Sequence, residues 1–398
     1  MPQTDPWLLP EGIAEILPED AQYLEATRRN LLDVFSAWGY ERVIPPLIDF
    51  IETLKIGSGQ DLDLQTFKLI DQLSGQMLGI RADMTPQVAR IDAHQLNQQW
   101  PTRLCYAGTI VHAQGSALDR SRIPMQIGAE LYGYQGLEGD MEIIRLMLEM
   151  LATAKLQNIH LDLGHVGVYR SLVAQAGLDG KQETLLFEVM QRKAQAELEV
   201  LLEDFNLDAK LTNIFLKLPG LNGGEEIFTR AQEILSGAND QVQSAIADLQ
   251  QVSKLLSKYF PALTVSFDLA ELRGYHYHTG IVFAAFVPEC GREIARGGRY
   301  DNIGLAFGRA RPATGFSADL KVLSALSKQL NPQPVITKIF APNSDDQKLY
   351  DMIRDLRAQG RIVIQQLSDQ TGSAEDMGCT SSIIQEEQSW VIKTLEQQ

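Results

Sequence analysis

The chain has 398 residues and carries 51 acidic against 35 basic side chains, a formal net charge of −16. A potential of that sign repels polyanions and makes a working tRNA-binding surface an unfavourable reading, because phosphate neutralisation needs lysine and arginine. Its 44% hydrophobic and 22% charged content is ordinary for a globular protein, and its length predicts one large domain with smaller attachments.

The N-terminal residues and the apolar runs show no targeting or membrane pattern. Residues 1–10 lack the basic and then apolar order of a signal peptide, and runs such as residues 282–287 are far shorter than the roughly 18 residues of a membrane span. We therefore expect a cytoplasmic protein. Cys105, Cys290 and Cys379 form no CxxC pair and are odd in number, which favours buried free thiols over a zinc or disulfide framework.

The first third of the chain alternates between one helix and several short strands. Apolar residues at helical spacing predict a helix over residues 21–38, which Gly39 ends. Residues 42–48 resemble a strand interrupted by Pro45 and Pro46, which restricts it to a sheet edge that a partner subunit could cover. Further β-rich runs with few crossover helices between them predict an antiparallel sheet: residues 65–70, 77–81, 103–112 and 124–133.

The middle of the chain predicts a sheet that is split by helices. A helix over residues 140–154 precedes a strand over 160–164, and residues 168–258 show helical patterns rich in Ala, Leu, Gln and Glu. We interpret the latter as a helical insertion. The β-pattern then resumes at residues 263–269, 280–287 and 293–297, so that the large domain spans residues 1–329.

A small α/β unit follows a proline-containing linker at residues 330–334. The pattern predicts a strand over residues 335–340, a helix over 345–358, a strand over 361–367 and a final hairpin over 382–394. Residues 335–398 therefore form a second domain.

The densest functional signal lies at residues 271–280 and 297–301. Strand alternation would place Arg273, Tyr277 and other polar groups on one face, which must satisfy its hydrogen bonds and so lines a cleft. The competing interpretation is a half-buried strand whose arginine pairs with a nearby carboxylate. His276 and His278 lack a third ligand motif, which favours hydrogen-bonded rings over a metal site.

These runs resemble the two histidine-specific motifs of histidyl-tRNA synthetases. Pro46 is similar to the class II motif 1 proline, residues 81–85 to the amino-acid loop, and Gln126, Gly128 and Glu130 to the end of motif 2. The resemblance covers roughly residues 7–325. It implies an α+β, class II synthetase-like domain in which an antiparallel sheet of about six strands is flanked by helices and motif 1 builds a dimer interface.

The resemblance also implies a pocket for free histidine. There Asp83 and Glu130 would pair with the ammonium group, and Arg273 offers a planar fork for the carboxylate. Tyr277 and Tyr300 would supply aromatic walls near the imidazole. The full set of implied histidine-binding residues is Asp83, Thr85, Gln126, Glu130, Arg273, Tyr277, His278 and Tyr300.

The sequence departs from a synthetase at the positions that hold ATP. Val111 stands where motif 2 places its arginine, Ala113 where a glutamate follows, and Val322, beside Lys321, where motif 3 places the second arginine. Losing one preorganised donor costs on the order of 100-fold to 1000-fold in rate, so losing two should abolish adenylation. His278 replaces an expected tyrosine, and the small unit resembles a trimmed anticodon-binding domain.

The run at residues 83–91 is more similar to the regulatory subunits of ATP phosphoribosyltransferase, a synthetase-like family without catalytic residues. That resemblance implies a short-form catalytic subunit as partner, no cofactor or metal, and a role in the first step of histidine biosynthesis with feedback by histidine. Two other readings remain open from the sequence. An active histidyl-tRNA synthetase would exchange pyrophosphate with ATP, and a free-standing histidine-binding paralogue would bind histidine without a partner.

Overall fold

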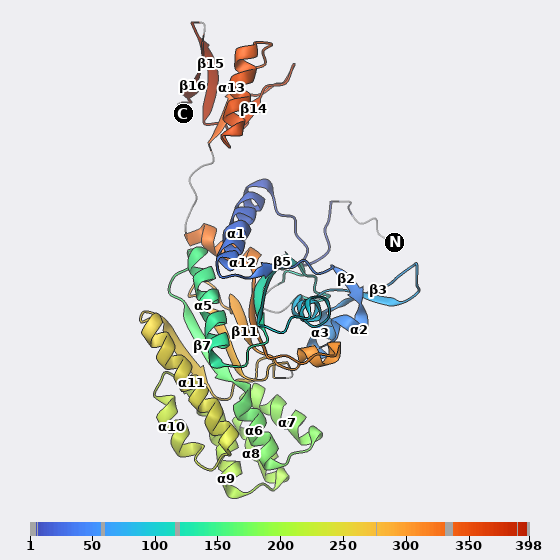
Figure 1. Cartoon of the computed structure of the whole chain (residues 1–398), viewed down its shortest axis with the longest axis vertical. Helices are drawn as coiled ribbons and strands as arrows, with labels where there is room; N and C mark the ends of the chain where they lie inside the picture. Colours follow the sequence, from blue (N-terminus) through green and yellow to red (C-terminus); the bar gives the residue numbers. More distant parts are fainter. Residues whose placement is uncertain are drawn as a thin grey trace. The chain divides into compact units, whose positions relative to one another are not determined.

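The computed structural model describes residues 5, 7–56, 60–115, 120–275, 277–330, 337–387 and 389–395. The chain divides into two compact units, Met1–Asn331 and Pro332–Gln398 (Figure 1). Among the described helices, none combines the length and apolar character that a membrane crossing requires.

A nine-stranded sheet forms the centre of the first unit. All neighbours are antiparallel except β1 with β5 and β7 with β9, which are parallel. The sheet therefore has more strands than the six or so expected, and two of its pairs are parallel rather than antiparallel. Strands of two residues and parallel pairs leave little pattern in the local sequence. The spatial order is β1 (Glu41–Arg42), β5 (Thr102–Thr109), β6 (Met125–Tyr132), β12 (Ala313–Asp319), β11 (Ala295–Arg299), β10 (Ile281–Phe286), β7 (His160–His165), β9 (Thr264–Asp268) and β8 (Asn222–Gly223).

Three helices pack with this sheet through its main core: α1 (Pro18–Ala37), α5 (Leu137–Thr153) and α12 (Leu320–Leu330). Pro18 starts α1, with Glu19 and Asp20 in the first turn, where a free N–H is not needed and negative charge is favourable. The helix buries Leu31 and Phe35, and the Phe35 ring meets Phe316 of β12 edge-on at 5.9 Å. The α-helical spacing of apolar residues is thus explained by burial against the sheet.

The two prolines at 45 and 46 separate strands of different sheets rather than interrupting one strand. β1 pairs in the large sheet, whereas β2 (Ile48–Phe50) pairs with β4 (Met77–Ile80), which pairs with β3 (Phe67–Ile70). The short helices α2 (Ile51–Leu54), α3 (Gln60–Gln65) and α4 (Thr85–Arg90) and the π-helix Ile91–Leu96 accompany this second sheet. Ile48 and Phe50 of the edge strand β2 remain 45% and 49% exposed.

A helical segment lies between β7 and β9. Figure 1 shows its helices gathered at one end of the first unit, with α11 running along α6. The helix α6 (Val166–Ala176) ends at Gly177, whose φ of +66° suits a left-handed C-terminal residue. The remaining helices are α7 (Gly180–Gln191), α8 (Gln195–Phe205), α9 (Ala209–Lys217), the 3₁₀ turn Leu218–Gly220, α10 (Ile227–Ile234) and α11 (Asp240–Tyr259).

The second unit is a four-stranded sheet with one helix. Its order is β14 (Ile362–Gln365), β13 (Lys338–Ala341), β15 (Ser381–Glu386) and β16 (Ser389–Thr394), and α13 (Gln347–Ala358) buries an apolar stripe against it. Asp346 caps α13 by accepting from Lys348 N at 2.8 Å, and it also accepts from the Trp390 indole at 2.8 Å. This unit contains the expected strand, helix, strand and hairpin. Residues 331–336, which include most of the expected linker and the start of the expected first strand, lie outside the described residues.

Candidate functional site

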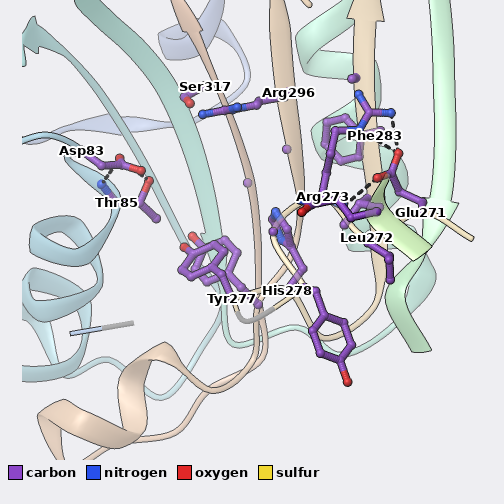
Figure 2. A pocket seen from close by; sticks show the side chains of 18 of the residues that line it. Asp83, Thr85, Glu271, Leu272, Arg273, Tyr277, His278, Phe283, Arg296 and Ser317 are labelled. Atoms are coloured by element: carbon purple, nitrogen blue, oxygen red, sulfur yellow. Dashed lines mark hydrogen bonds and ion pairs between the residues drawn. The ribbon is translucent and has the colours of Figure 1, made fainter. Parts of the chain in front are cut away.

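A cavity of about 1060 Å³ lies on the large sheet, over β10, β11 and β12. Figure 2 shows Asp83 and Thr85 at one side of it, Tyr277 and His278 in the middle, and Arg273 with Glu271 at the other side. Seven of the eight residues expected to bind histidine line this cavity: Asp83, Thr85, Glu130, Arg273, Tyr277, His278 and Tyr300. Gln126 is not part of the wall.

Residues 271–275 and 277–279 form turns and irregular backbone, so the strand expected there, with its alternating faces, was wrong. The chain leaves β9 at Asp268 and enters β10 at Ile281. Gly274 has a φ of +63°, and its carbonyl accepts from the backbone N–H groups of Tyr277 at 2.8 Å and His278 at 2.7 Å. A side chain at Gly274 would also overlap the His278 ring. Glycine therefore permits the turn that brings these rings into the cavity. His276 lies outside the described residues.

Glu130 is the buried acid at the bottom of the cavity, only 2% exposed. Tyr106 donates to its Oε1 at 2.9 Å, Thr85 to the same oxygen at 3.2 Å, and Tyr300 to its Oε2. Burial, with a contribution from the charge of Asp83, raises the pKa of Glu130 to about 8 against these three donors. The carboxyl group is therefore largely protonated at neutral pH until a cation approaches it.

Replacing Glu130 by Gln is expected to flatten the pH dependence of stability. The pKa is about 8 in the folded chain and 4.5 as the ordinary value, so folding retains a proton that the unfolded chain releases. This contribution is complete below pH 4.5 and is lost as the pH rises to about 8. Urea unfolding of wild type and Glu130→Gln at pH 5 and pH 8 measures it. The exposed control Glu199→Gln should follow wild type. If the free energy of unfolding changes equally between pH 5 and pH 8 in wild type and in Glu130→Gln, the raised pKa of Glu130 is contradicted.

Asp83 has one oxygen engaged and one available. Its Oδ1 accepts from Thr85 N at 2.9 Å, Thr85 Oγ1 at 3.0 Å and Gln126 Nε2 at 2.9 Å. Within the described ranges no donor reaches Oδ2. Gln126 uses its carbonyl to accept from Met84 N at 2.9 Å. Both ends of its amide are occupied by groups of the chain, so in this structure Gln126 positions Asp83.

The aromatic part of the wall is preorganised by stacking. Tyr277 stacks on Tyr300 with ring centroids 4.8 Å apart, and His278 meets Tyr277 edge-on at 5.0 Å. The Tyr277 hydroxyl is buried and has no hydrogen-bond partner among the described residues. Burial lowers the pKa of His278 to about 4, so its ring is neutral at physiological pH. An unpaired buried hydroxyl costs free energy that a bound polar ligand would recover.

Arg273 is paired with acidic side chains of the chain itself. Its Nε donates to Glu271 Oε2 at 2.7 Å, and its Nη2 donates to Asp162 Oδ2 at 2.6 Å. The competing interpretation from the sequence, an arginine paired with nearby carboxylates, is therefore what the structure shows, although Arg273 also lines the cavity.

One wall of the cavity comes from the helical segment and was missed by the sequence analysis. Helix α7 contributes Glu183 and Phe187. Tyr275 OH donates to Glu183 at 2.6 Å, and Arg170 Nη2 donates to the carbonyls of Tyr275 at 2.7 Å and His278 at 3.0 Å. These contacts join groups about 90 to 110 positions apart in the chain, so no local pattern could reveal them.

Positions 111 and 322, where the synthetase motifs place an arginine, supply no cation to the cavity. The Val111 backbone N–H donates to Arg81 O at 3.0 Å, and Val322 is half-buried against the core in α12. Lys321, beside Val322, also lies on α12, and it donates to Ile123 O at 2.5 Å. Among the described residues no group of three His, Cys, Asp or Glu side chains is arranged to hold a metal ion.

Two family models match the chain. The histidyl-tRNA synthetase model matches residues 12–323, and the model of the ATP phosphoribosyltransferase subunit HisZ C-terminal domain matches residues 337–393. Similar proteins named ATP phosphoribosyltransferase regulatory subunit occur in Methylococcus capsulatus, at 54% identity over 98% of this chain and 97% of the relative, and in Thioalkalivibrio sulfidiphilus, at 50% identity over 99% of this chain and 100% of the relative.

Solved structures agree with these matches at the level of the fold. A crystal structure from Bacillus halodurans, described as an ATP phosphoribosyltransferase regulatory subunit/histidyl-tRNA synthetase, has a TM-score of 0.83 and 27% identity over 95% of this chain and 97% of that chain. Histidyl-tRNA synthetase from Nostoc sp. PCC 7120 has a TM-score of 0.76 and 17% identity over 96% of this chain and 92% of that chain. The predicted α+β, class II synthetase-like fold is confirmed.

Proposed function

The chain belongs to the ATP phosphoribosyltransferase regulatory subunits, a family related to histidyl-tRNA synthetase, and from this premise we propose that it senses free histidine in the cavity described above. It is a regulatory subunit of an enzyme of histidine biosynthesis rather than a catalyst. The proposal adds that a short-form catalytic subunit is its partner in the cytoplasm, and that histidine bound here inhibits the complex.

The observation that carries the proposal is that two residues on the wall of one cavity each have a polar oxygen without a hydrogen-bond partner among the described residues. Asp83 Oδ2 is available to an ammonium group, and the buried Tyr277 hydroxyl is available to an imidazole nitrogen. Glu130 and the neutral His278 ring supply further hydrogen-bonding groups for the imidazole or the ammonium. Thr85 and Tyr300 hold Glu130, and Gln126 holds Asp83. A ligand with one ammonium group and one imidazole matches this arrangement.

Feedback requires more than binding. Histidine shifts the activity of the complex only if its affinity differs between the active and inactive states. Residues 271–275, 277 and 278 form part of the cavity wall without belonging to a strand, so a ligand can bias their position at the smallest cost in sheet hydrogen bonds.

Self-association through the motif 1 region is part of the same proposal. Ile48 and Phe50 lie on the edge strand β2 and are half-exposed, and Ile44, just before the two prolines, is 76% exposed. An edge strand with apolar side chains is a surface that a second copy would cover. We also propose that residues 335–398 are a trimmed counterpart of an anticodon-binding domain, and that the chain does not bind tRNA.

Titration calorimetry with L-histidine tests the site. Asp83→Asn is expected to weaken binding about 10-fold to 100-fold, because a charge-assisted hydrogen bond contributes about 1.5–3 kcal/mol. Asp204→Asn, an exposed substitution on α8, is the matched control and should bind like wild type. Equal affinity of Asp83→Asn and wild type would reject this placement of the ammonium group.

A mixing experiment tests the function. The purified chain, added to a short-form catalytic subunit, should raise the rate of ATP phosphoribosylation, and L-histidine should lower it. The chain alone should show no histidine-dependent exchange of pyrophosphate with ATP. Exchange activity would favour the synthetase alternative, whereas histidine binding without any effect on the catalytic subunit would favour a free-standing binding module.

A further inference from the structure

The end of the cavity opposite Asp83 is already neutralised by the chain itself. Glu271 Oε2 lies 2.7 Å from Arg273 Nε and 2.5 Å from Arg273 Nη2, and Asp162 Oδ2 lies 2.6 Å from the same Nη2. One guanidinium group therefore faces two carboxylates. Burial lowers the pKa of Arg273 and the two carboxylates raise it, with a net rise, so the guanidinium group stays charged beside them.

The backbone of Arg273 also takes part in its pairing with Glu271. The Arg273 N–H donates to Glu271 Oε1 at 2.7 Å while the Arg273 side chain donates to Glu271 Oε2, so that the two ends of one carboxylate fix both parts of the arginine. Glu271 is 8% exposed, and it lies so close to Gly164 of β7 that a side chain there would overlap it. The arginine is therefore oriented by the turn, before any ligand arrives.

The wall of the cavity carries more acidic than basic side chains. Among the described residues of its wall, five carboxyl groups stand against two guanidinium groups, those of Arg273 and Arg296. Arg296 pairs with Glu293 at 3.2 Å and is 70% exposed, so solvent screens it. Even with Glu130 protonated, acids outnumber cations. A ligand carboxylate that reached this end would be a third anion on Arg273, close to Glu271.

We propose that this cavity recognises its ligand by the imidazole and ammonium groups and gains nothing from the carboxylate. The inference rests on the proposed histidine site and defines its ligand class as imidazole-bearing primary amines, with or without a carboxylate. Derivatives in which the carboxylate is replaced by a neutral alcohol or amide bind at least as tightly as histidine, because they keep the cation that Asp83 accepts and remove the anion that faces Glu271.

Calorimetry on the full chain with four probes tests this. L-Histidinol and L-histidinamide should bind with dissociation constants equal to or up to about 10-fold below that of L-histidine. Imidazole propionate, which keeps the carboxylate and lacks the ammonium group, should not bind measurably. If the alcohol and the amide bind more than 10-fold more weakly than L-histidine, the carboxylate contributes to binding. The inference then fails, whereas the proposed histidine site is still supported. If no probe binds, the proposed site itself fails.

Substitutions of Glu271 and Asp162, the two acidic partners of Arg273, provide a second test of the inference. Glu271→Gln and Asp162→Asn each release Arg273 from one carboxylate, so each should tighten L-histidine about threefold to tenfold while leaving L-histidinol within about twofold. Two separate positions guard against a local folding defect at one of them, which circular dichroism detects. An equal change for both ligands in both variants, or no change for either ligand, would overturn the inference.

Discussion

Replacing Arg299 by methionine is expected to lower the free energy of unfolding by about 3–5 kcal/mol. Arg299 is 7% exposed and donates to Asp140 Oδ2 at 2.8 Å from Nη2 and at 3.1 Å from Nε, and Asp140 is 2% exposed in the first turn of α5. Without the guanidinium group the Asp140 carboxylate is left buried and uncompensated. Urea unfolding followed by tryptophan fluorescence measures the loss.

The double variant Arg299→Met with Asp140→Leu separates a charge effect from a packing effect. Apolar groups that replace both members of a buried pair are often neutral or stabilising, so the double variant should recover much of the loss. Arg192→Met breaks the exposed pair with Glu197, in which both side chains are 56% exposed, and should leave the unfolding curve unchanged. A double variant as unstable as Arg299→Met would show that Arg299 acts through its other contacts, those with the carbonyls of Tyr134 and Gly136 and with the Asp301 carboxylate.

Replacing Gly315 by alanine is expected to weaken L-histidine binding about 10-fold to 100-fold and to lower stability by about 1–3 kcal/mol. Gly315 pairs with Glu130 across β12 and β6. A methyl group at this position would overlap Glu130 Oε2 and approach the Ala129 carbonyl to 2.8 Å. The carboxyl group must then leave the place where Tyr106 and Tyr300 hold it, and the bottom of the cavity changes shape.

A second substitution identifies the source of the clash. In a Glu130→Ala background the overlapping carboxyl group is absent, so Gly315→Ala should cost clearly less stability there than in wild type. Gly220→Ala is the matched control, because nothing lies within 4 Å of a side chain at that position. Equal costs in both backgrounds would place the strain at the Ala129 carbonyl and leave Glu130 undisturbed.

Much of the fold could be predicted because periodic burial marks it locally. The helix predicted over residues 140–154 is observed at Leu137–Thr153, and the final hairpin predicted over 382–394 is observed at Ser381–Thr394. The parallel pairing of β1 with β5 and the two-residue strand β8 could not be predicted, because strand partners are chosen by tertiary contacts rather than by the strand's own residues.

The site shows a similar division. The resemblance to the synthetase motifs predicted seven residues of the cavity wall, because those motifs lie around a single ligand in that family. It could not predict that Glu271 and Asp162 occupy Arg273, since Asp162 lies 111 residues away in the chain. The strand expected over residues 273–279 was wrong because Gly274 adopts a positive φ, a conformation that alternation of residue types does not signal.

The anchorage of Tyr275 has a mechanical consequence. Its ring meets Tyr169 of α6 edge-on at 5.2 Å, it lies 5.4 Å from the Phe187 ring of α7, and its hydroxyl binds Glu183. Three residues further on, His278 faces the cavity. A movement of α6 or α7 therefore either carries the turn that holds Tyr275 and His278 with it or breaks these contacts of Tyr275. The position of these two helices is thus coupled to the wall of the cavity.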